Sequence, residues 1–216
     1  MMNSKKKIIN INVIFLCLLF VIFISAYNIN HDNLWFDEIL SFWITDPKIS
    51  TQESFIRHKQ IEAIPFLYHY ILKKYFMIFS YDSDIGRYSS LIFNFLGVIF
   101  ATLLCKNIKK NNAYLLALFL FSTNIFLISY SQELRPYSLI FFLSSLNLYL
   151  FFKAHLFSVN KNRVIYTIIF TFSQILMIIS HPFTLIIFFS TSLFLGLSFV
   201  RKQNISKILL YSFYSI

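Results

Sequence analysis

Residues 88–105 read YSSLIFNFLGVIFATLLC, a stretch without a single charged side chain. The hydrocarbon core of a bilayer is about 30 Å thick, and a helix needs roughly 20 mostly apolar residues to cross it. This stretch nearly reaches that length, so it is interpreted as a membrane-spanning helix. Similar apolar windows lie before and after it, at residues 8–26, 113–130, 137–152, 164–180 and 183–200.

The composition of the whole chain agrees with this interpretation. Of its 216 residues, 57% are hydrophobic and only 13% are charged, which is far too apolar for a soluble domain. The sequence therefore predicts an all-α polytopic membrane protein, with residues 1–216 forming a single transmembrane domain of about six complete spanning helices. A seventh apolar run begins at residues 208–216, and we expect the chain to be the N-terminal part of a longer protein.

The net charge of +10 is distributed along the chain and does not form one patch. The basic residues flank the apolar windows, which favours the positive-inside rule over nucleic-acid binding. A cytoplasmic N-terminus places four basic groups inside, and these are Lys5 to Lys7; Lys106, Lys109 and Lys110; Lys153, Lys161 and Arg163; and Arg201, Lys202 and Lys207. Frequent Lys, Asn and Ile residues, without a disulfide pattern, are typical of a protein of a bacterial inner membrane.

The same orientation places all nine acidic residues outside, most of them in a long outer loop over residues 28–87. Within this loop, apolar residues recur at helical spacing, at Phe36, Ile39, Leu40, Trp43 and Ile44. This pattern predicts an amphipathic helix that lies along the membrane interface, with its polar face, which carries Asp37, Glu38, Ser41 and Thr45, turned to water. A second interfacial helix is predicted between Glu62 and Ser80.

Several polar side chains of the outer surface are candidates for a functional site, because charged groups at the edge of the hydrocarbon are costly unless they are paired or solvated. They are Asp37, Glu38, Arg87, Glu133, Arg135, Tyr137 and His181. Structural roles remain open for each of them. The two acids of the first loop suit a solvated helix face, Glu133 and Arg135 suit an ion pair in a turn, Arg87 suits a snorkelling anchor and His181 suits an interfacial polar tip.

Two motifs among these residues resemble a known family. Trp35-Phe36-Asp37-Glu38 follows the first span, and Gln132-Glu133-Leu134-Arg135-Pro136-Tyr137 forms the second outer turn. Together with the long outer loop and the arginine at the start of the second span, they resemble the N-terminal part of GT-C glycosyltransferases. The resemblance covers residues 8–190 and is greatest to the family 39-like group, which includes protein mannosyltransferases and lipid A aminoarabinose transferases. Many relatives carry His-Pro-Pro-Leu where this chain reads Ala63-Ile64-Pro65-Phe66-Leu67.

The resemblance implies a GT-C-like helical bundle that transfers a sugar from a polyprenyl-phosphate donor, on the extracytoplasmic side, to a hydroxyl of a glycan, lipid or protein. In such a reaction a carboxylate takes the proton of the attacking hydroxyl. Asp37 is the first candidate for this base, and Glu38 would orient the acceptor, the sugar or a metal. Asp37 and Glu38 are also candidate ligands for a divalent cation, and the sequence leaves the metal open.

The leaving phosphate gathers negative charge, which guanidinium groups stabilise by bidentate hydrogen bonds. Arg135 is the first candidate for this role, followed by Arg87. Glu133 would orient Arg135 or bind sugar hydroxyls, and Tyr137 would stack on the sugar or bond to the phosphate.

Two other interpretations remain open. A transporter or flippase for a lipid-linked glycan would also need outer charges, although it should carry ionisable residues near the middle of the membrane, where this sequence has only uncharged polar residues. An inactive fragment would retain the motifs of the first half without their function.

Overall fold

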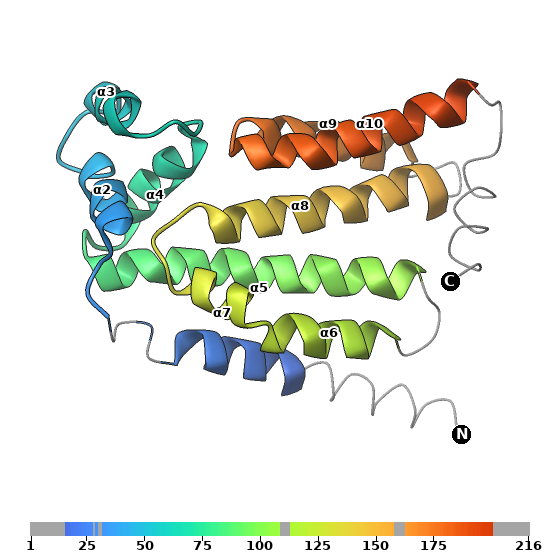
Figure 1. Ribbon diagram of the computed structural model, residues 1–216, viewed down its shortest axis with the longest axis horizontal. Helices are drawn as coiled ribbons and strands as arrows, with labels where there is room; N and C mark the ends of the chain where they lie inside the picture. Colours follow the sequence, from blue (N-terminus) through green and yellow to red (C-terminus); the bar gives the residue numbers. More distant parts are fainter. Residues whose placement is uncertain (1–15, 28, 30–31, 109–112, 158–162, 201–216) are drawn as a thin grey trace.

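The computed structural model describes residues 16–27, 29, 32–108, 113–157 and 163–200, and these described residues are helices joined by short turns and loops (Figure 1). An apolar helix at Leu16–Ala26 comes first. The helices that follow are α2 (Phe36–Ile44), α3 (Thr51–Ile61), α4 (Leu67–Ile78), α5 (Ser83–Ile108), α6 (Ala113–Thr123), α7 (Ile125–Ser131), α8 (Tyr137–Phe152), the π-helix η1 (Lys153–Phe157), α9 (Arg163–Ile178), the 3₁₀-helix η2 (Pro182–Thr184) and α10 (Leu185–Val200). The all-α fold class predicted from the sequence is therefore confirmed for the described residues.

Two of these helices are long and apolar enough to cross a membrane, α5 and the continuous helix Tyr137–His155. Together α6 and α7 would make a third span, but they bend by 58° at Asn124. The apolar window predicted over 113–130 is therefore observed as two helices, which amount to one span only if the bent pair crosses the membrane together. Asn124 explains the break, because its side-chain Oδ1 accepts a hydrogen bond from the Leu127 amide at 3.1 Å and so caps a new helix.

The remaining apolar helices, Leu16–Ala26, Arg163–Ile178 and Pro182–Leu197, are shorter than a usual span. The structure therefore has two or three helices of spanning length among its described residues, where the sequence predicted about six. Residues 8–15, which belong to the first predicted span, and the apolar run at 208–216 lie outside the described residues.

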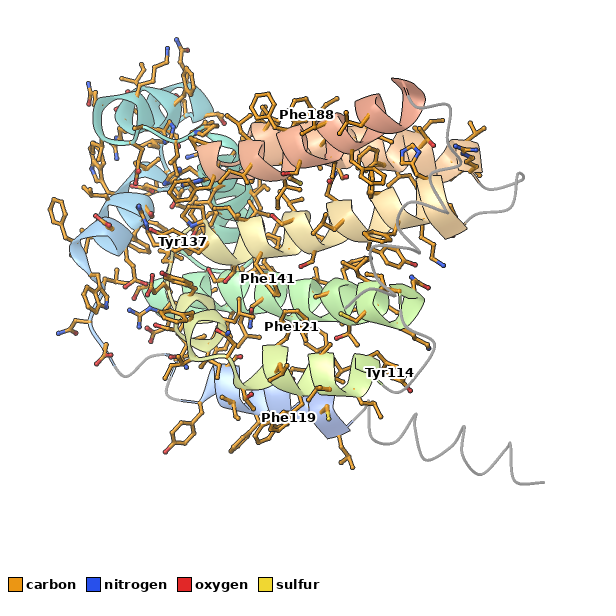
Figure 2. The ribbon with its side chains drawn as sticks, turned by 45° about the vertical axis from the view of Figure 1, so that its right-hand side comes forward. Tyr114, Phe119, Phe121, Tyr137, Phe141 and Phe188 are labelled. Atoms are coloured by element: carbon orange, nitrogen blue, oxygen red, sulfur yellow. The ribbon has the colours of Figure 1, made fainter. Side chains whose placement is uncertain are left out.

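The long helices lie side by side, with α5 between α6 and α8, and with α9 and α10 beyond α8 (Figure 1). Gly97 lets α5 approach α8 closely: a Cβ atom at this position would lie only 2.4 Å from Cδ1 of Phe141. Figure 2 shows Phe141 on the face of α8 that is turned to α5. Small residues at such contacts are a common device in membrane helix packing, where the surrounding lipid is as apolar as the helix surfaces.

Polar side chains connect the later helices. Asn147 is fully buried in α8, and its Nδ2 donates a hydrogen bond to Oγ of Ser173 in α9 at 2.7 Å. Gln174 of α9 donates in turn to Oγ1 of Thr191 in α10 at 3.1 Å. Such interhelical bonds contribute about 0.6 kcal/mol each on average in membrane proteins. The polar residues within the predicted spans are thus used, at these positions, to hold helices together.

The first outer loop is folded into α2, α3 and α4, which gather at one end of the long helices (Figure 1). Lys73 of α4 is fully buried, and its ammonium donates to the carbonyl oxygens of Asp46 and of Ile49, the latter at 2.9 Å. Oγ of Ser54 in α3 donates to the carbonyl of Ile44 at 2.5 Å. These buried bonds satisfy the backbone of the α2–α3 connection and fix the three helices against one another.

The helix predicted from Phe36 is observed as α2, and the second predicted helix is observed as α4, which is shorter than the predicted range. The predicted orientation of the polar face of α2 is wrong in part. Glu38, Ser41 and Thr45 are buried against the protein, whereas Phe36 and Ile39 are exposed. The helix therefore turns most of its polar face to the other outer elements and presents apolar side chains to its surroundings.

Candidate functional site

The candidate residues lie where four outer segments meet. Figure 1 shows α2, the link from α3 to α4, the start of α5 and the turn between α7 and α8 at the same end of the long helices. The turn between α9 and α10, which carries His181, also lies at this end (Figure 1). The topology thus brings together side chains that are far apart in the sequence.

Glu38 and Arg87 form a buried ion pair at the base of this region. Nη2 of Arg87 lies 2.9 Å from Oε2 of Glu38, and Nε of Arg87 lies 3.2 Å from Oε1, so the carboxylate is held by two parallel bonds. The other guanidinium nitrogen, Nη1, donates to the carbonyl oxygens of Ile29 and Asp32 at 2.9 and 2.8 Å. Arg87 therefore binds the chain segment that leads into α2.

Both oxygens of Glu38 also accept bonds from the backbone. The Leu134 amide donates to Oε1 at 2.6 Å, and the Trp35 amide donates to Oε2 at 3.0 Å. The second of these bonds caps the N-terminus of α2, while the first fixes the α7–α8 turn. Glu38 is therefore a buried structural carboxylate, and its hydrogen bonds are made to other parts of the protein. The solvated position that the sequence suggested for Glu38 is wrong.

Asp37, the neighbour of Glu38, points about 100° away from it around the helix axis and is open to its surroundings. Its side chain is 62% exposed, and its Oδ2 lies 3.8 Å from Nη2 of Arg135. Arg135 also donates a long bond, 3.4 Å, to the carbonyl oxygen of Asp37. An accessible carboxylate therefore stands beside a guanidinium group, with which it forms a loose ion pair.

Arg135 makes its closest contact with Glu62, a residue that the sequence analysis did not select. Its Nη1 donates to Oε1 of Glu62 at 2.7 Å, and both side chains are mostly buried, at 13% and 10% exposure. Burial alone would lower the pKa of Arg135, but the bond to Glu62 and the charges of Glu62 and Asp37 outweigh it and raise the pKa. The guanidinium is thus always charged. The predicted partner, Glu133, is replaced by Glu62 in this contact.

The remaining predicted residues surround this group. His181 is buried and caps η2, where its Nδ1 accepts a bond from the Phe183 amide at 3.2 Å. Burial lowers the pKa of His181, and the nearby charge of Arg135 lowers it further, which favours a neutral ring. The ring of Tyr137, at the start of α8 (Figure 2), lies 4.6 Å from the ring of Tyr130.

Glu133 is half-buried in the α7–α8 turn. Burial raises the pKa of Glu133, as does the negative charge of Glu38, while Arg135 and Arg87 act in the opposite direction. Its electrostatic neighbours are therefore the same residues that form the site. Raised carboxyl pKa values are frequent at functional sites, and this is a reason to keep Glu133 among the candidates.

A pair of histidine rings, His58 and His69, was not among the residues predicted from the sequence. The His58 and His69 rings lie 4.9 Å apart, and His69 is fully buried with neither ring nitrogen bonded to a described residue. Burial lowers the pKa of His69 to about 3. Nε2 of His58 lies 2.8 Å from the Ile64 carbonyl. The two rings come from different helices, α3 and α4, so no local sequence pattern marks the pair.

The described residues contain no group of three His, Cys, Asp or Glu side chains placed to hold a metal ion. Asp37 and Glu38 were considered together as cation ligands from the sequence. The structure turns them in different directions, with Glu38 bonded to Arg87 and Asp37 exposed. The pair therefore does not form a shared chelating site in this arrangement.

Comparison of the chain with models of protein families, with curated proteins and with solved structures found no match.

Proposed function

We propose that the chain is a membrane glycosyltransferase of GT-C type, or the N-terminal part of one, which transfers a sugar from a polyprenyl-phosphate donor to an acceptor hydroxyl. The observation that carries this proposal is the exposed Asp37 carboxylate, 3.8 Å from the Arg135 guanidinium. A displacement at an anomeric carbon needs a base for the nucleophile and a cation for the leaving phosphate, and these two groups stand next to each other.

The proposed reaction is a single displacement. The acceptor oxygen forms a bond to the anomeric carbon and gives its proton to Asp37, while the bond between that carbon and the phosphate oxygen breaks. The electron pair of the broken bond remains on the polyprenyl phosphate, whose charge Arg135 stabilises. The acceptor is a glycan, a lipid or a protein hydroxyl.

The other candidates take supporting roles in this proposal. Glu133 and Tyr137 bind the sugar, and His181, as a neutral ring beside Arg135, offers a hydrogen bond to the sugar or the phosphate. Glu38 and Arg87 hold the segments that carry Asp37 and Arg135, because Glu38 bonds both Arg87 and the Leu134 amide. This assignment makes them positioning residues.

The proposed setting is the bacterial inner membrane, with a cytoplasmic N-terminus and the site on the extracytoplasmic side. Basic residues are found at the end of the long helices opposite the site, at Lys106, Lys153 and Arg163, which agrees with the positive-inside rule. We count the shorter apolar helices Leu16–Ala26, α9 and α10 as spans here, which gives a bundle of about six spanning helices. The exposed side chains of Trp35, Phe36 and Trp43 support a position of α2 at the interface, at the depth of the lipid phosphate.

A transfer assay tests this function. Membranes that contain the chain and a polyprenyl-phosphate sugar are compared with membranes that contain Asp37→Asn at the same expression level. We expect transfer by the wild type and a loss of at least about 100-fold in the variant, since general base catalysis is typically worth 10²–10⁴-fold. Asp84→Asn, which changes an exposed acid in the first turn of α5, is the matched control and should remain active.

If an inserted wild-type chain transfers no sugar, the enzyme proposal fails, and the inactive fragment and the lipid-linked glycan transporter become the next hypotheses. Equal activity of Asp37→Asn and the wild type would retain the enzyme and reject Asp37 as its base.

A further inference from the structure

Glu62 is the partner of Arg135, and neither the sequence motifs nor the proposed reaction assigns it a role. It lies 73 positions before Arg135 in the chain, yet the two side chains are in direct contact, at 2.7 Å. Both are largely shielded from their surroundings, with exposed fractions of 10% and 13%. A charge-assisted bond between two mostly buried groups is strong and directional.

The contacts of Arg135 show which of its donors remain for a ligand. Nη1 donates to Glu62 at 2.7 Å and makes a long bond, 3.4 Å, to the carbonyl oxygen of Asp37, whereas Nε is buried without a partner among the described residues. Nη2 lies 3.8 Å from Oδ2 of Asp37, beyond hydrogen-bond distance. Nη2 is therefore the donor that faces the exposed carboxylate of Asp37, while the shortest bond of Nη1 is to Glu62.

Glu62 itself is well anchored. It is the C-cap of α3, directly after the last helical residue, and its amide donates to the carbonyl of His58 at 2.8 Å. Nε2 of His58 contacts the Ile64 carbonyl at 2.8 Å, so the same histidine side chain fixes the segment that follows Glu62. The carboxylate is thus carried by a short, fixed segment, which suits a group that orients another side chain.

We propose that Glu62 is a positioning residue, which holds Arg135 by Nη1 so that Nη2 stays available to the phosphate of a polyprenyl-phosphate ligand instead of closing on Asp37. This inference rests on the proposed function for the identity of the ligand. Without Glu62, the nearest anion for the guanidinium is Asp37, and a direct pair between them would occupy both the phosphate-binding group and the base. Misplacement of a positioning contact by about 1 Å is enough to cost about 100-fold in rate.

The test measures the binding of a short polyprenyl phosphate, without sugar, to the full chain in nanodiscs, and then the kcat and KM for sugar transfer. Four variants are compared: Glu62→Ala, Glu62→Gln, Arg135→Ala and Glu53→Ala. Gln keeps an oxygen that accepts a bond from Nη1, whereas Ala removes it. Glu53→Ala is the matched control, since it breaks a pair between Glu53 and Arg57 in α3, at 3.2 Å, away from the site.

We expect Arg135→Ala and Glu62→Ala to weaken phosphate binding at least about tenfold and to lower kcat, Glu62→Gln to remain within about threefold, and Glu53→Ala to match the wild type. Equal or tighter binding by Glu62→Ala would overturn the inference, because Glu62 would then be neutral or a competitor of the phosphate. Equal losses of phosphate binding in Glu62→Ala and Glu62→Gln would also overturn the inference. Glu62 would then act through its negative charge and not by orienting Arg135.

This experiment distinguishes a failure of the glycosyltransferase proposal from a failure of the role inferred for Glu62. A wild-type chain that binds the phosphate but transfers no sugar would reject the glycosyltransferase, and the binding series would still decide the role of Glu62. A wild-type chain that melts cooperatively but binds no polyprenyl phosphate would overturn the inference itself. Variants are compared only at melting temperatures within a few degrees of the wild type, so that loss of fold is not counted as loss of binding.

Discussion

Two adjacent acids, Asp37 and Glu38, have opposite environments, and this difference determines what each can do. Successive residues of a helix point about 100° apart, so one of them can be buried while the other is exposed. Glu38 accepts bonds from Arg87, Leu134 and Trp35, whereas the exposed carboxylate of Asp37 lies 3.8 Å from the Arg135 guanidinium. A catalytic base must be accessible to its substrate, and Asp37 meets this requirement. A buried structural anion needs hydrogen-bond donors around it, and Glu38 has them.

The buried pair should be essential for folding. Arg87→Met leaves the Glu38 carboxylate buried without its partner, and we expect a loss of about 3–5 kcal/mol of stability. Thermal unfolding of the purified chain in detergent measures this loss. Glu53→Gln, which breaks the more exposed pair with Arg57, should cost under about 1 kcal/mol. Similar effects of the two substitutions would contradict a structural role for the pair.

His69 predicts how stability depends on pH. Burial lowers its pKa from 6.5 to about 3, so the unfolded chain binds a proton between these values that the folded chain does not. Stability is therefore complete above pH 6.5 and falls below it, by up to about 1.4 kcal/mol per pH unit. We expect the unfolding temperature to drop between pH 7.5 and 5.5, and His69→Phe to reduce this drop.

The pH dependence of the unfolding temperature that remains in His69→Phe is due in part to His58, because burial lowers the pKa of His58 as well. An unfolding temperature that depends on pH equally in the wild type and in His69→Phe would show that folding does not lower the pKa of His69, which would contradict this prediction.

At the scale of the elements, the contact of α5 with α8 depends on the absence of a side chain at Gly97. An added Cβ would lie 2.4 and 2.6 Å from two ring atoms of Phe141 (Figure 2), so Gly97→Ala must displace the ring. We expect a cost of about 1–3 kcal/mol, measured by thermal unfolding in detergent. Gly196→Ala is the control, because nothing lies within 4 Å of its added Cβ. If both substitutions were neutral, the helices would not be in close contact at Gly97.

Helix periodicity predicted α2 correctly but not which of its faces meets the protein. The spacing of Phe36, Ile39 and Trp43 defines an apolar face, yet in a protein surrounded by lipid such a face can point outwards. Three of the four polar side chains opposite this face, Glu38 among them, turned out to be buried. Periodicity separates the faces of a helix, whereas the neighbours of each face depend on the tertiary fold.

Capping residues carried information about two elements that apolar windows miss. The helix α3 is mostly polar, so no apolar window marks it, but Ser50 accepts a bond from the Glu53 amide at 3.0 Å, as a Ser-x-x-Glu sequence predicts. Asn124 marks the start of α7 inside an apolar window in the same way. Local capping patterns thus locate these boundaries, because they depend only on residues three or four positions apart.

At the scale of the whole molecule, the site is a consequence of chain topology. Asp37, Glu62, Arg135 and His181 come from four segments that meet at one end of the long helices (Figure 1). The positive charge of Arg135 suggests an acidic partner, but no local sequence pattern distinguishes Glu62 from Glu133 as that partner. That choice depends on how the α3–α4 link reaches the α7–α8 turn, which only the folded chain determines.

The first experiment on the proposed glycosyltransferase uses the purified full chain and a polyprenyl-phosphate sugar labelled in both the sugar and the lipid. We expect the chain to release one polyprenyl phosphate for each sugar transferred, and we expect Asp37→Asn, but not Asp84→Asn, to suppress both products together. A stably folded wild-type chain that leaves the donor intact with glycan, lipid and protein acceptors, or an Asp37→Asn variant that is fully active, would contradict this proposal.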